Sequence, residues 1–320
     1  MSQCKPYVIG IDMGGTNTEV AVVDTRGKIT ASASFKTCDC LEFEDFVSSV
    51  EKACRRVMGE VGGPQMITGV GIGAPNANFY TGNIENAANL PWKGTLPLGE
   101  RLSEVLDLPV AVTNDANAAA IGEMTYGAAR GLRDFIMITL GTGLGAGIVI
   151  NGELVYGSDG YAGELGHVKI RRDGRKCGCG QNGCLETYCS ASGLARTAVE
   201  FLNTRSDDSL LRQSDPSAIT SKDVYEAAMK GDALAKEVFE FTGNLLGEAL
   251  ADFVCFSAPE AIILFGGLAQ AGNLLFEPVK RSMEENLLPI WKDKVSLVSS
   301  SLKLSEAAVL GAAALGWKAK

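Results

Sequence analysis

One pattern occurs twice in this chain and restricts its possible folds more than any other feature. Residues 7–24 read YVIGIDMGGTNTEVAVVD, and residues 135–150 read FIMITLGTGLGAGIVI. Each copy consists of an apolar strand, a turn rich in Gly and Thr, and a second apolar strand, which is the pattern of a β-hairpin. The recurrence predicts two related halves that face each other.

The rest of the sequence indicates a mixed α/β protein. The stretch near 113–122, within TNDANAAAIGE, is typical of a loop that enters a helix, and we place the break between the two halves there. Apolar periodicity predicts helices at 43–59, at about 186–204, within 222–257 and over 306–317, and strands at 66–73, 109–113 and 261–265. The segment 75–99 is predicted to be a long loop.

Composition narrows the possible functions. The chain has 320 residues, 46% of them hydrophobic, which is enough for two domains with sizeable cores. Its formal net charge of −9 argues against a surface for nucleic acid or for an anionic membrane. The N-terminus lacks a signal pattern, and no apolar run reaches the roughly 18 residues that a membrane helix needs. We therefore expect a cytoplasmic protein whose cysteines are free thiols outside any metal site.

Four potential metal ligands lie close together in the second half. His167 is the only histidine of the chain, and Cys177, Cys179 and Cys184 follow it in a glycine-rich loop. One imidazole and three thiolates suit a single tetrahedral zinc ion in a closed structural site. Buried or redox-active cysteines are the alternative, but a lone histidine beside CxCxxxxC favours zinc. Because two carboxylates flank the cluster, at Glu164 and Glu186, zinc would also shape a polar pocket.

The turns of the two hairpins suit phosphate groups. Glycine lets the backbone approach a ligand closely, and exposed N–H groups with Thr hydroxyls can neutralise phosphoryl oxygens without a basic surface. Each turn taken alone is more often only a hairpin turn. The segment GTGLGA also fits a loose dinucleotide fingerprint, but a strand follows it where that fingerprint requires a helix.

Two further segments carry polar side chains at informative places. Asn114 and Asp115 follow a predicted strand and precede an Ala-rich helix, so this pair is either a helix N-cap or a carboxylate placed to accept a proton from a hydroxyl. The loop at 76–89 is rich in Asn, which offers the donors and acceptors that a polyol requires. We select Asn89, next to Leu90-Pro91-Trp92, although an Asn in such a loop is more often a turn residue.

These segments together resemble the ROK family of sugar kinases and repressors, nearly from end to end. The resemblance rests on DMGGTNTE, GIGAPN, NLPW, TNDANAAA, TLGTGLGAGI, GELGH, CGCGQNGCLE and LFGG. It implies the actin-like ATPase (ribonuclease H-like) fold, in which two α/β domains lie around a cleft. We expect a smaller domain at 1–117, a larger one with the zinc site at 118–305, and a C-terminal helix at about 306–320 that packs back on the first.

The resemblance also implies roles for individual residues. Asp115 would be the catalytic base that takes the proton of the sugar 6-hydroxyl, and Asp12 would lie near Mg²⁺. The implied sugar ligands are Asn89, Asn114, Asp115, Glu164, His167 and Glu186. The implied contacts to ATP are Asp12, Gly14, Gly15, Thr16, Gly141, Thr142, Gly143, Gly266 and Gly267. Zn²⁺ would be held by His167, Cys177, Cys179 and Cys184, with the second ring nitrogen of His167 facing the sugar.

The function implied is that of an ATP-dependent hexose kinase acting on the 6-hydroxyl, and residues 185–193 resemble the glucokinase branch. N-acetylmannosamine kinase and fructokinase are the alternatives within the family. A sugar-responsive transcriptional repressor is disfavoured because the first strand starts by residue 7, and a non-catalytic sugar-binding relative is disfavoured by Asp115. Relatives often carry Lys at the position of Asn17, so the preferred phosphoryl donor stays open. We further expect a homodimer.

Overall fold

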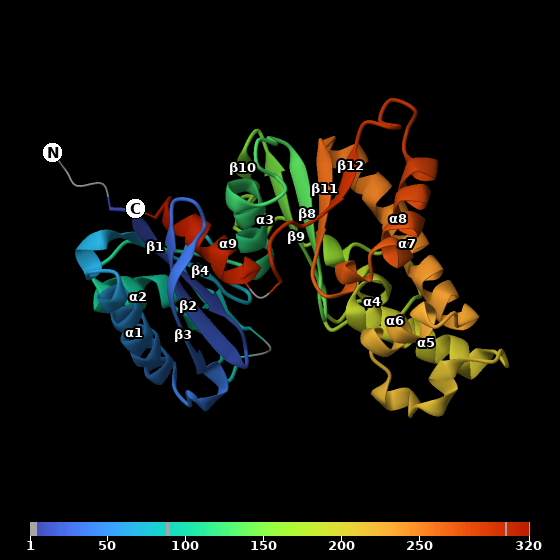
Figure 1. Ribbon diagram of the computed structural model, residues 1–320, viewed down its shortest axis with the longest axis horizontal. Coiled ribbons are helices and arrows are strands. Elements are labelled where there is room, and N and C mark those ends of the chain that lie inside the picture. The colour runs from blue at the N-terminus through green and yellow to red at the C-terminus, as the bar shows by residue number, and fades with distance from the viewer. Residues whose placement is uncertain (1–4, 88–89, 305, 320) are drawn as a thin grey trace.

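The computed structural model describes residues 5–87, 90–304 and 306–319. Two five-stranded sheets lie side by side along its long axis (Figure 1). The first sheet has the order β3-β2-β1-β4-β7. Its strands are β1 (Tyr7–Met13), β2 (Asn17–Asp24), β3 (Ile29–Lys36), β4 (Ile67–Gly73) and β7 (Val110–Thr113). The pairs β1–β2 and β2–β3 are antiparallel, whereas β4 and β7 run parallel to β1.

The second sheet repeats this arrangement. Its order is β10-β9-β8-β11-β12. Its strands are β8 (Phe135–Leu140), β9 (Leu144–Ile150), β10 (Glu153–Leu154), β11 (Ala261–Phe265) and β12 (Ser296–Ser299). Again the first strand forms an antiparallel hairpin with the second, and the two later strands run parallel to the first. The actin-like ATPase fold predicted from the sequence is thus confirmed.

Helices cover the two sheets differently. On the first sheet, α1 (Phe43–Glu60) and α2 (Leu98–Leu106) complete one apolar core, and the loop between β4 and α2 contains the short hairpin β5 (Ile84–Glu85) and β6 (Thr95–Leu96). The second core is larger and packs on one face of the second sheet. Its helices are α4 (Glu186–Cys189), α5 (Ala191–Thr204), α6 (Ser221–Met229), α7 (Ala233–Ser257) and α8 (Asn273–Asn286).

Two helices lie between the sheets, α3 (Asp115–Tyr126) and α9 (Ala307–Gly316) (Figure 1). The C-terminal helix α9 packs on β1 and β4 at two glycines. A Cβ at Gly10 would lie 2.2 Å from the carbonyl oxygen of Val309, and one at Gly71 would lie 2.0 Å from that of Ala312. Only glycine allows this approach. Helix α3 packs on α9 and on β9, so it contacts both halves.

The chain crosses from one half to the other after β7 and returns after β12. A buried carboxylate ties these two crossings together. Glu123, near the end of α3, accepts a hydrogen bond from the backbone N–H of Ala128 at 2.6 Å and a short one from the hydroxyl of Ser300, which follows β12. The domain boundary at residue 117 stays a prediction. Among the described residues, no helix combines the length and the apolar character needed to span a bilayer.

Candidate functional site

Two carboxylates meet at one edge of the first sheet. Asp12 lies near the end of β1, and Asp115 directly follows β7 as the first residue of α3. Because β1, β4 and β7 are parallel, their carboxyl ends share that edge. Burial, together with the nearby charge of Asp115, raises the pKa of Asp12 to about 6. The carboxyl groups are therefore close enough to repel each other, which is typical of a functional site.

Asp115 has the surroundings of a proton acceptor. Partial desolvation raises the pKa of its carboxyl above the usual range, although the N–H of Ala116 donates a hydrogen bond to it at 2.8 Å and lowers the pKa in part. A carboxylate with a raised pKa is a stronger base once it is ionised. The cap of α3 is Asn114, whose side chain accepts from the N–H of Asn117 at 2.7 Å. The N-cap role thus falls to Asn114, which leaves Asp115 available for chemistry.

The hairpin turns lie at the ends of β1 and β8, and both present glycine and threonine backbone. In the first turn, the N–H of Gly14 donates to the carbonyl of Asn17 at 2.9 Å, and Thr16 is exposed. Asn17 pairs across the strands with exposed Lys36. In the second turn, the N–H of Gly141 donates to the carbonyl of Gly143 at 3.0 Å.

Gly266 and Gly267 follow β11 and lie beside the second turn. Strand β11 pairs with β8 up to Phe265 opposite Thr139. Gly266 has a φ of +104°, and a Cβ there would lie 2.5 Å from the carbonyl oxygen of Leu140. A Cβ on Gly267 would meet open space. The structure therefore brings this pair of glycines to the phosphate-suited turn at 141–143.

Glu186 connects the second turn with the residues selected as sugar ligands. It is the first residue of α4, and its carboxylate accepts a hydrogen bond from the N–H of Leu144 at 3.0 Å. A Cβ at Gly143 would lie 2.3 Å from the same carboxylate oxygen. The pKa of Glu164 is raised, chiefly by desolvation, while His167 lowers it and the charges of Asp115 and Glu186 raise it further. The carboxyl of Glu164 is therefore coupled electrostatically to those of Asp115 and Glu186.

The four expected metal ligands converge. One donor atom from each of His167, Cys177, Cys179 and Cys184 lies within 4.8 Å of all the others. The Sγ atoms of Cys179 and Cys184 are 3.7 Å apart, and Cys177 Sγ is 3.7 Å from His167 Nδ1. Two thiolates bound tetrahedrally at the usual Zn–S distance of about 2.3 Å are about 3.8 Å apart. The donor types and their spacing therefore fit one zinc ion.

The other ring nitrogen of His167 points away from the cysteine cluster. His167 Nε2 lies 3.8 Å from a carboxylate oxygen of Glu164. The single histidine thus contacts the cysteine cluster with one nitrogen and the expected sugar ligands with the other. Asn89 falls outside the described residues, so its place in the site stays a prediction.

Sequence reasoning missed Arg175, which braces the segment that carries Glu186. Its side chain is buried and donates hydrogen bonds to the carbonyls of Thr187 at 2.7 Å and Gly193 at 3.0 Å, and its charge pairs with Glu200. The guanidinium also lies 4.4 Å from the ring centroid of Tyr188. A single arginine in a polar loop gives no local signal for such a role, because all of its partners come later in the chain.

The chain matches the ROK family over residues 8–319. It is 37% identical to a glucokinase of Halalkalibacterium halodurans, with 98% of this chain and 95% of that protein covered. A solved ROK family glucokinase from Streptomyces griseus, in complex with glucose and AMPPNP, is 34% identical and superposes with a TM-score of 0.80 over 98% of this chain and 99% of that one. A xylose repressor of Caldicellulosiruptor bescii is 28% identical over 96% of this chain and 77% of its own length.

Proposed function

This chain belongs to the ROK family, and we propose that it transfers the γ-phosphoryl group of ATP to the 6-hydroxyl of a hexose, with glucose as the substrate. The observation that carries the proposal is the position of Asp115. Its carboxyl has a raised pKa and is coupled electrostatically to Asp12, just before the first turn, and to Glu164 of the second half. A kinase acting on an alcohol needs a proton acceptor at that place.

Each part of the site has a role in this reaction. Asp115 accepts the proton of the sugar hydroxyl as that oxygen attacks the γ-phosphorus. The further sugar ligands that we propose are Asn89, Asn114, Glu164, His167 and Glu186. Backbone N–H groups of the two turns bind the phosphates, which spares a chain of net charge −9 the need for a basic surface. Movement of the two halves toward each other would exclude water, so that the sugar rather than water is phosphorylated.

We propose two metal ions with different tasks. Mg²⁺ would lie near Asp12 and neutralise charge on the phosphates of ATP. Zn²⁺ would be held by His167 and the three cysteines, and it would be structural because four protein ligands leave no open position. Zinc would then act on sugar binding indirectly, by fixing the ring of His167 and the segment that leads to Glu186.

The choice of glucose among hexoses is supported by the relatives. The glucokinases of H. halodurans and S. griseus are 37% and 34% identical to this chain, and the latter was crystallised with glucose. N-acetylmannosamine and fructose are the alternative substrates within the family. A regulator without catalysis is the other candidate, because the chain is also 28% identical to a xylose repressor.

A coupled assay of ADP release over a hexose panel tests the proposal, with the purified Asp115→Asn protein as a matched control. We expect turnover with glucose, glucose 6-phosphate as the product by NMR, and little turnover in the control. Faster turnover with N-acetylmannosamine or fructose would change the substrate. Sugar binding without ADP release from any hexose would contradict kinase activity and support the regulator.

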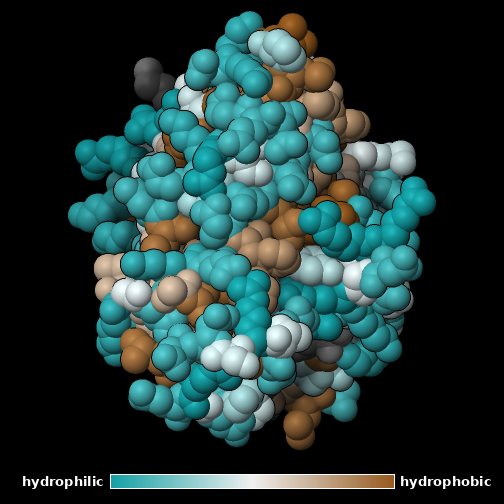
Figure 2. All heavy atoms as spheres, turned by 90° about the vertical axis from the view of Figure 1, so that its right-hand side faces the viewer, coloured by the Kyte–Doolittle hydropathy of each residue, from teal (hydrophilic) through white to brown (hydrophobic). Residues whose placement is uncertain are grey.

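We also propose that the protein is a cytoplasmic homodimer. Most of the face shown in Figure 2 is hydrophilic, with apolar patches between the charged side chains. Large apolar side chains are exposed in the second half, among them Phe256 at 80% and Ile290 at 61%. Exposed apolar side chains of this kind are often covered by a partner. Sedimentation equilibrium of wild type and of a Phe256→Ser, Ile290→Ser double variant tests the dimer; a wild-type monomer would contradict it.

A further inference from the structure

A loop of the first half is fastened directly to a loop of the second half. Residues 78–81 lie between β4 and β5, and residues 156–160 follow β10. We call the contacts between these two loops the latch. The second loop continues into Glu164 and His167, two of the proposed sugar ligands. The latch therefore joins the first half, in which strand β7 leads to Asp115, to the segment of the second half that contains the proposed sugar ligands Glu164 and His167.

Asn78 forms the centre of the latch. Its side chain is 3% exposed, and its amide nitrogen donates to the carbonyl of Asp159 in the other half at 2.6 Å. Its amide oxygen accepts from the N–H groups of Tyr80 at 2.9 Å and Thr81 at 3.3 Å. One side chain thus shapes its own loop with its oxygen and holds the opposite loop with its nitrogen. Because the two functions use different atoms, they can be separated by substitution.

The opposite loop is shaped to receive Asn78. Gly160 has a φ of +92°, and a Cβ on it would lie 2.7 Å from the amide oxygen of Asn78. Residue 160 therefore meets two demands for glycine, one from backbone conformation and one from the close approach. Such a fit indicates that the two loops are matched in shape and do not merely touch.

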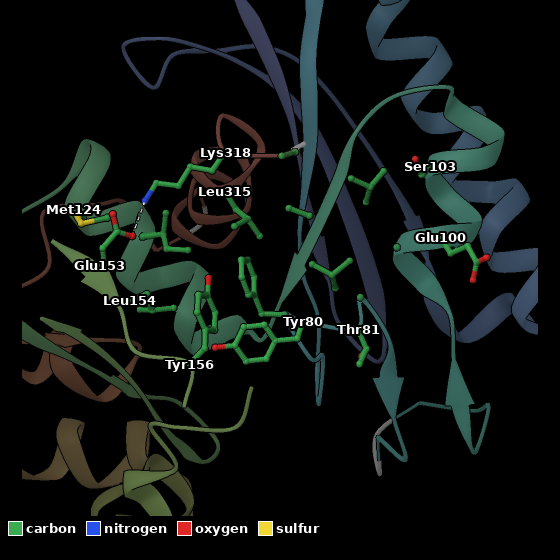
Figure 3. A pocket seen from close by; sticks show the side chains of 18 residues that line it. Tyr80, Thr81, Glu100, Ser103, Met124, Glu153, Leu154, Tyr156, Leu315 and Lys318 are labelled. Carbon is green, nitrogen blue, oxygen red and sulfur yellow. Dashed lines mark ion pairs between the residues drawn. The ribbon is translucent and has the colours of Figure 1, made fainter. Parts of the chain in front are cut away.

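Aromatic side chains complete the latch. Phe79 stacks on Tyr156 of the second half with ring centroids 3.8 Å apart and an interplanar angle of 8°. The hydroxyl of Tyr80 donates to the carbonyl of Gly157 at 2.8 Å, and Figure 3 shows its side chain pointing toward Tyr156. Tyr80 is 58% exposed, so its hydroxyl can be removed without disturbing a core.

A groove of about 760 Å³ runs between the two halves beside the latch (Figure 3). The groove also contains a second link between the halves, because Lys318, just beyond α9, pairs with Glu153 of β10 at 3.6 Å. Both of these side chains are exposed, at 54% and 80%, and pairs of that kind contribute little. The latch holds the loop that leads to the proposed sugar ligands, whereas the ion pair holds only the short strand β10, which precedes that loop.

We propose that Asn78 and Tyr80 are positioning residues for sugar binding. They hold residues 157–160 against the first half, and they thereby limit how far Glu164 and His167 can move away from Asp115. This inference rests on the proposed function, since it assigns the residues around Glu164 to the sugar. It predicts that loosening the latch weakens the binding of sugar and leaves the binding of nucleotide, at turns 12–16 and 141–143, unchanged.

Four variants test the proposal by steady-state kinetics with glucose and ATP varied separately. Tyr80→Phe removes one hydroxyl, and Asn78→Asp keeps the oxygen that shapes its own loop but loses the donor to Asp159. Asn78→Ala removes both functions. Lys318→Met is the matched control, because it removes the other link across the same groove. A net hydrogen bond corresponds to about fivefold in an equilibrium constant, so we expect the glucose KM to rise about fivefold in Tyr80→Phe and more in both Asn78 variants. The KM for ATP should stay within twofold, and Lys318→Met should resemble wild type.

Hydrogen exchange supplies a readout that does not depend on activity. Amides of residues 157–163 should exchange faster in Tyr80→Phe and in Asn78→Asp than in wild type, while those of β8 and β11 keep their protection. An unchanged glucose KM in Tyr80→Phe and both Asn78 variants would overturn the proposal. Equal rises in both KM values, or the same effect in Lys318→Met, would also overturn it, since either would show a general loosening of the two halves. A wild-type protein that phosphorylates no hexose would instead refute the proposed function; faster exchange in the variants would then show the latch without a role in catalysis.

Discussion

The two halves of the molecule share one strand order but differ in what they contribute to the site. The first half supplies Asp12 and the strand that leads to Asp115. The second half supplies Glu164, His167 and Glu186 from residues 155–186, which follow β10 and which we call the inserted segment. Even the matching hairpins differ. Asp12 precedes Gly14 by two residues, and the residue at the same place before Gly141 is Thr139, whose hydroxyl accepts the N–H of Gly145 at 3.1 Å within its own hairpin.

Two halves with the same strand order can therefore bind different reactants, phosphates at the repeated hairpins and a sugar at side chains. The repeated hairpins present backbone N–H groups, which suit the phosphates of any nucleotide and need no particular side chains. Selectivity for a sugar requires side chains, and three of the sugar ligands that we propose, Glu164, His167 and Glu186, lie in the inserted segment. There Arg175 holds the chain next to Glu186, and the proposed zinc ion would hold His167. We therefore expect changes at Asp12 and Asp115 to alter the rate, and changes in the inserted segment or in the latch that holds it to alter sugar affinity.

The largest effect expected tests this division at Asp115. Replacing Asp115 by Asn should lower kcat by about 10² to 10⁴, which is the usual contribution of general base catalysis. Sugar binding should persist, because the other five proposed sugar ligands are unchanged and three of them lie in the other half. Kinetics together with calorimetric glucose binding measure both quantities. A kcat within threefold of wild type would remove Asp115 from the role of base and would contradict the proposed difference in role between the two halves.

Removal of zinc should affect the inserted segment selectively. We expect one zinc per chain by elemental analysis of protein purified without added metal. In the zinc-free protein, glucose affinity should fall about ten- to a hundredfold, because His167 and the segment that leads to Glu186 would lose their fixed positions. Nucleotide affinity should be largely kept. Calorimetry with both ligands decides, and an equal loss of the two affinities would mean that the metal stabilises the whole molecule.

Two glycines of the second hairpin turn test whether that turn positions the carboxylate of Glu186. Gly143→Ala should weaken glucose binding about tenfold, since its Cβ would lie 2.3 Å from the carboxylate of Glu186 and must displace it. Gly141→Ala is the control, because a Cβ at that position meets nothing within 4 Å. Binding is measured without nucleotide, so that phosphate contacts of the turn do not contribute. Equal weakening by both substitutions would show that Glu186 is not positioned by this turn.

Local patterns were sufficient to predict much of the fold. Helix α1 spans Phe43–Glu60 where periodicity predicted 43–59, and β11 spans Ala261–Phe265 as predicted, because both elements have a regular apolar pattern. The helix predicted at about 186–204 is instead two helices, α4 and α5. Ser190 adopts an extended backbone with ψ of 172° and caps α5 by accepting the N–H of Gly193. A cap of that kind ends one helix and starts the next within a single apolar pattern.

The candidate site was predictable where its residues lie in short motifs, and not where distant residues meet. The proposed zinc ligands lie within one loop and its entry, so their spacing in the sequence was enough to predict that they lie close together. The bond from Asn78 to Asp159 joins residues 81 positions apart, and neither residue type is unusual at its place. Contacts of this kind depend on how the two halves pack, which local patterns do not specify. The roles of the site residues themselves remain predictions for the experiments above.

The smallest expected effect concerns stability, and it compares Asp12 with Thr139. Burial and the charge of Asp115 raise the pKa of Asp12 from 3.8 to about 6 in the folded protein. Between these values the folded state binds more protons than the unfolded state, so stability falls as pH rises through this window and the penalty is complete above pH 6. Asp12→Asn should therefore stabilise the magnesium-free protein at pH 7.5, although it impairs catalysis.

The expected gain is about 1 kcal/mol, less than the full shift implies, because the Asp12 carboxyl keeps some contact with solvent. It should vanish below about pH 3, where Asp12 is protonated in both states. Thr139→Val, at the matching place in the other hairpin, should destabilise by about 1 kcal/mol at every pH, since it removes an uncharged hydrogen bond. Urea unfolding at pH 3 and pH 7.5 measures both. A gain from Asp12→Asn that persists at pH 3 would show that its cause is packing rather than charge, and the two hairpins would then differ in shape and not in electrostatics.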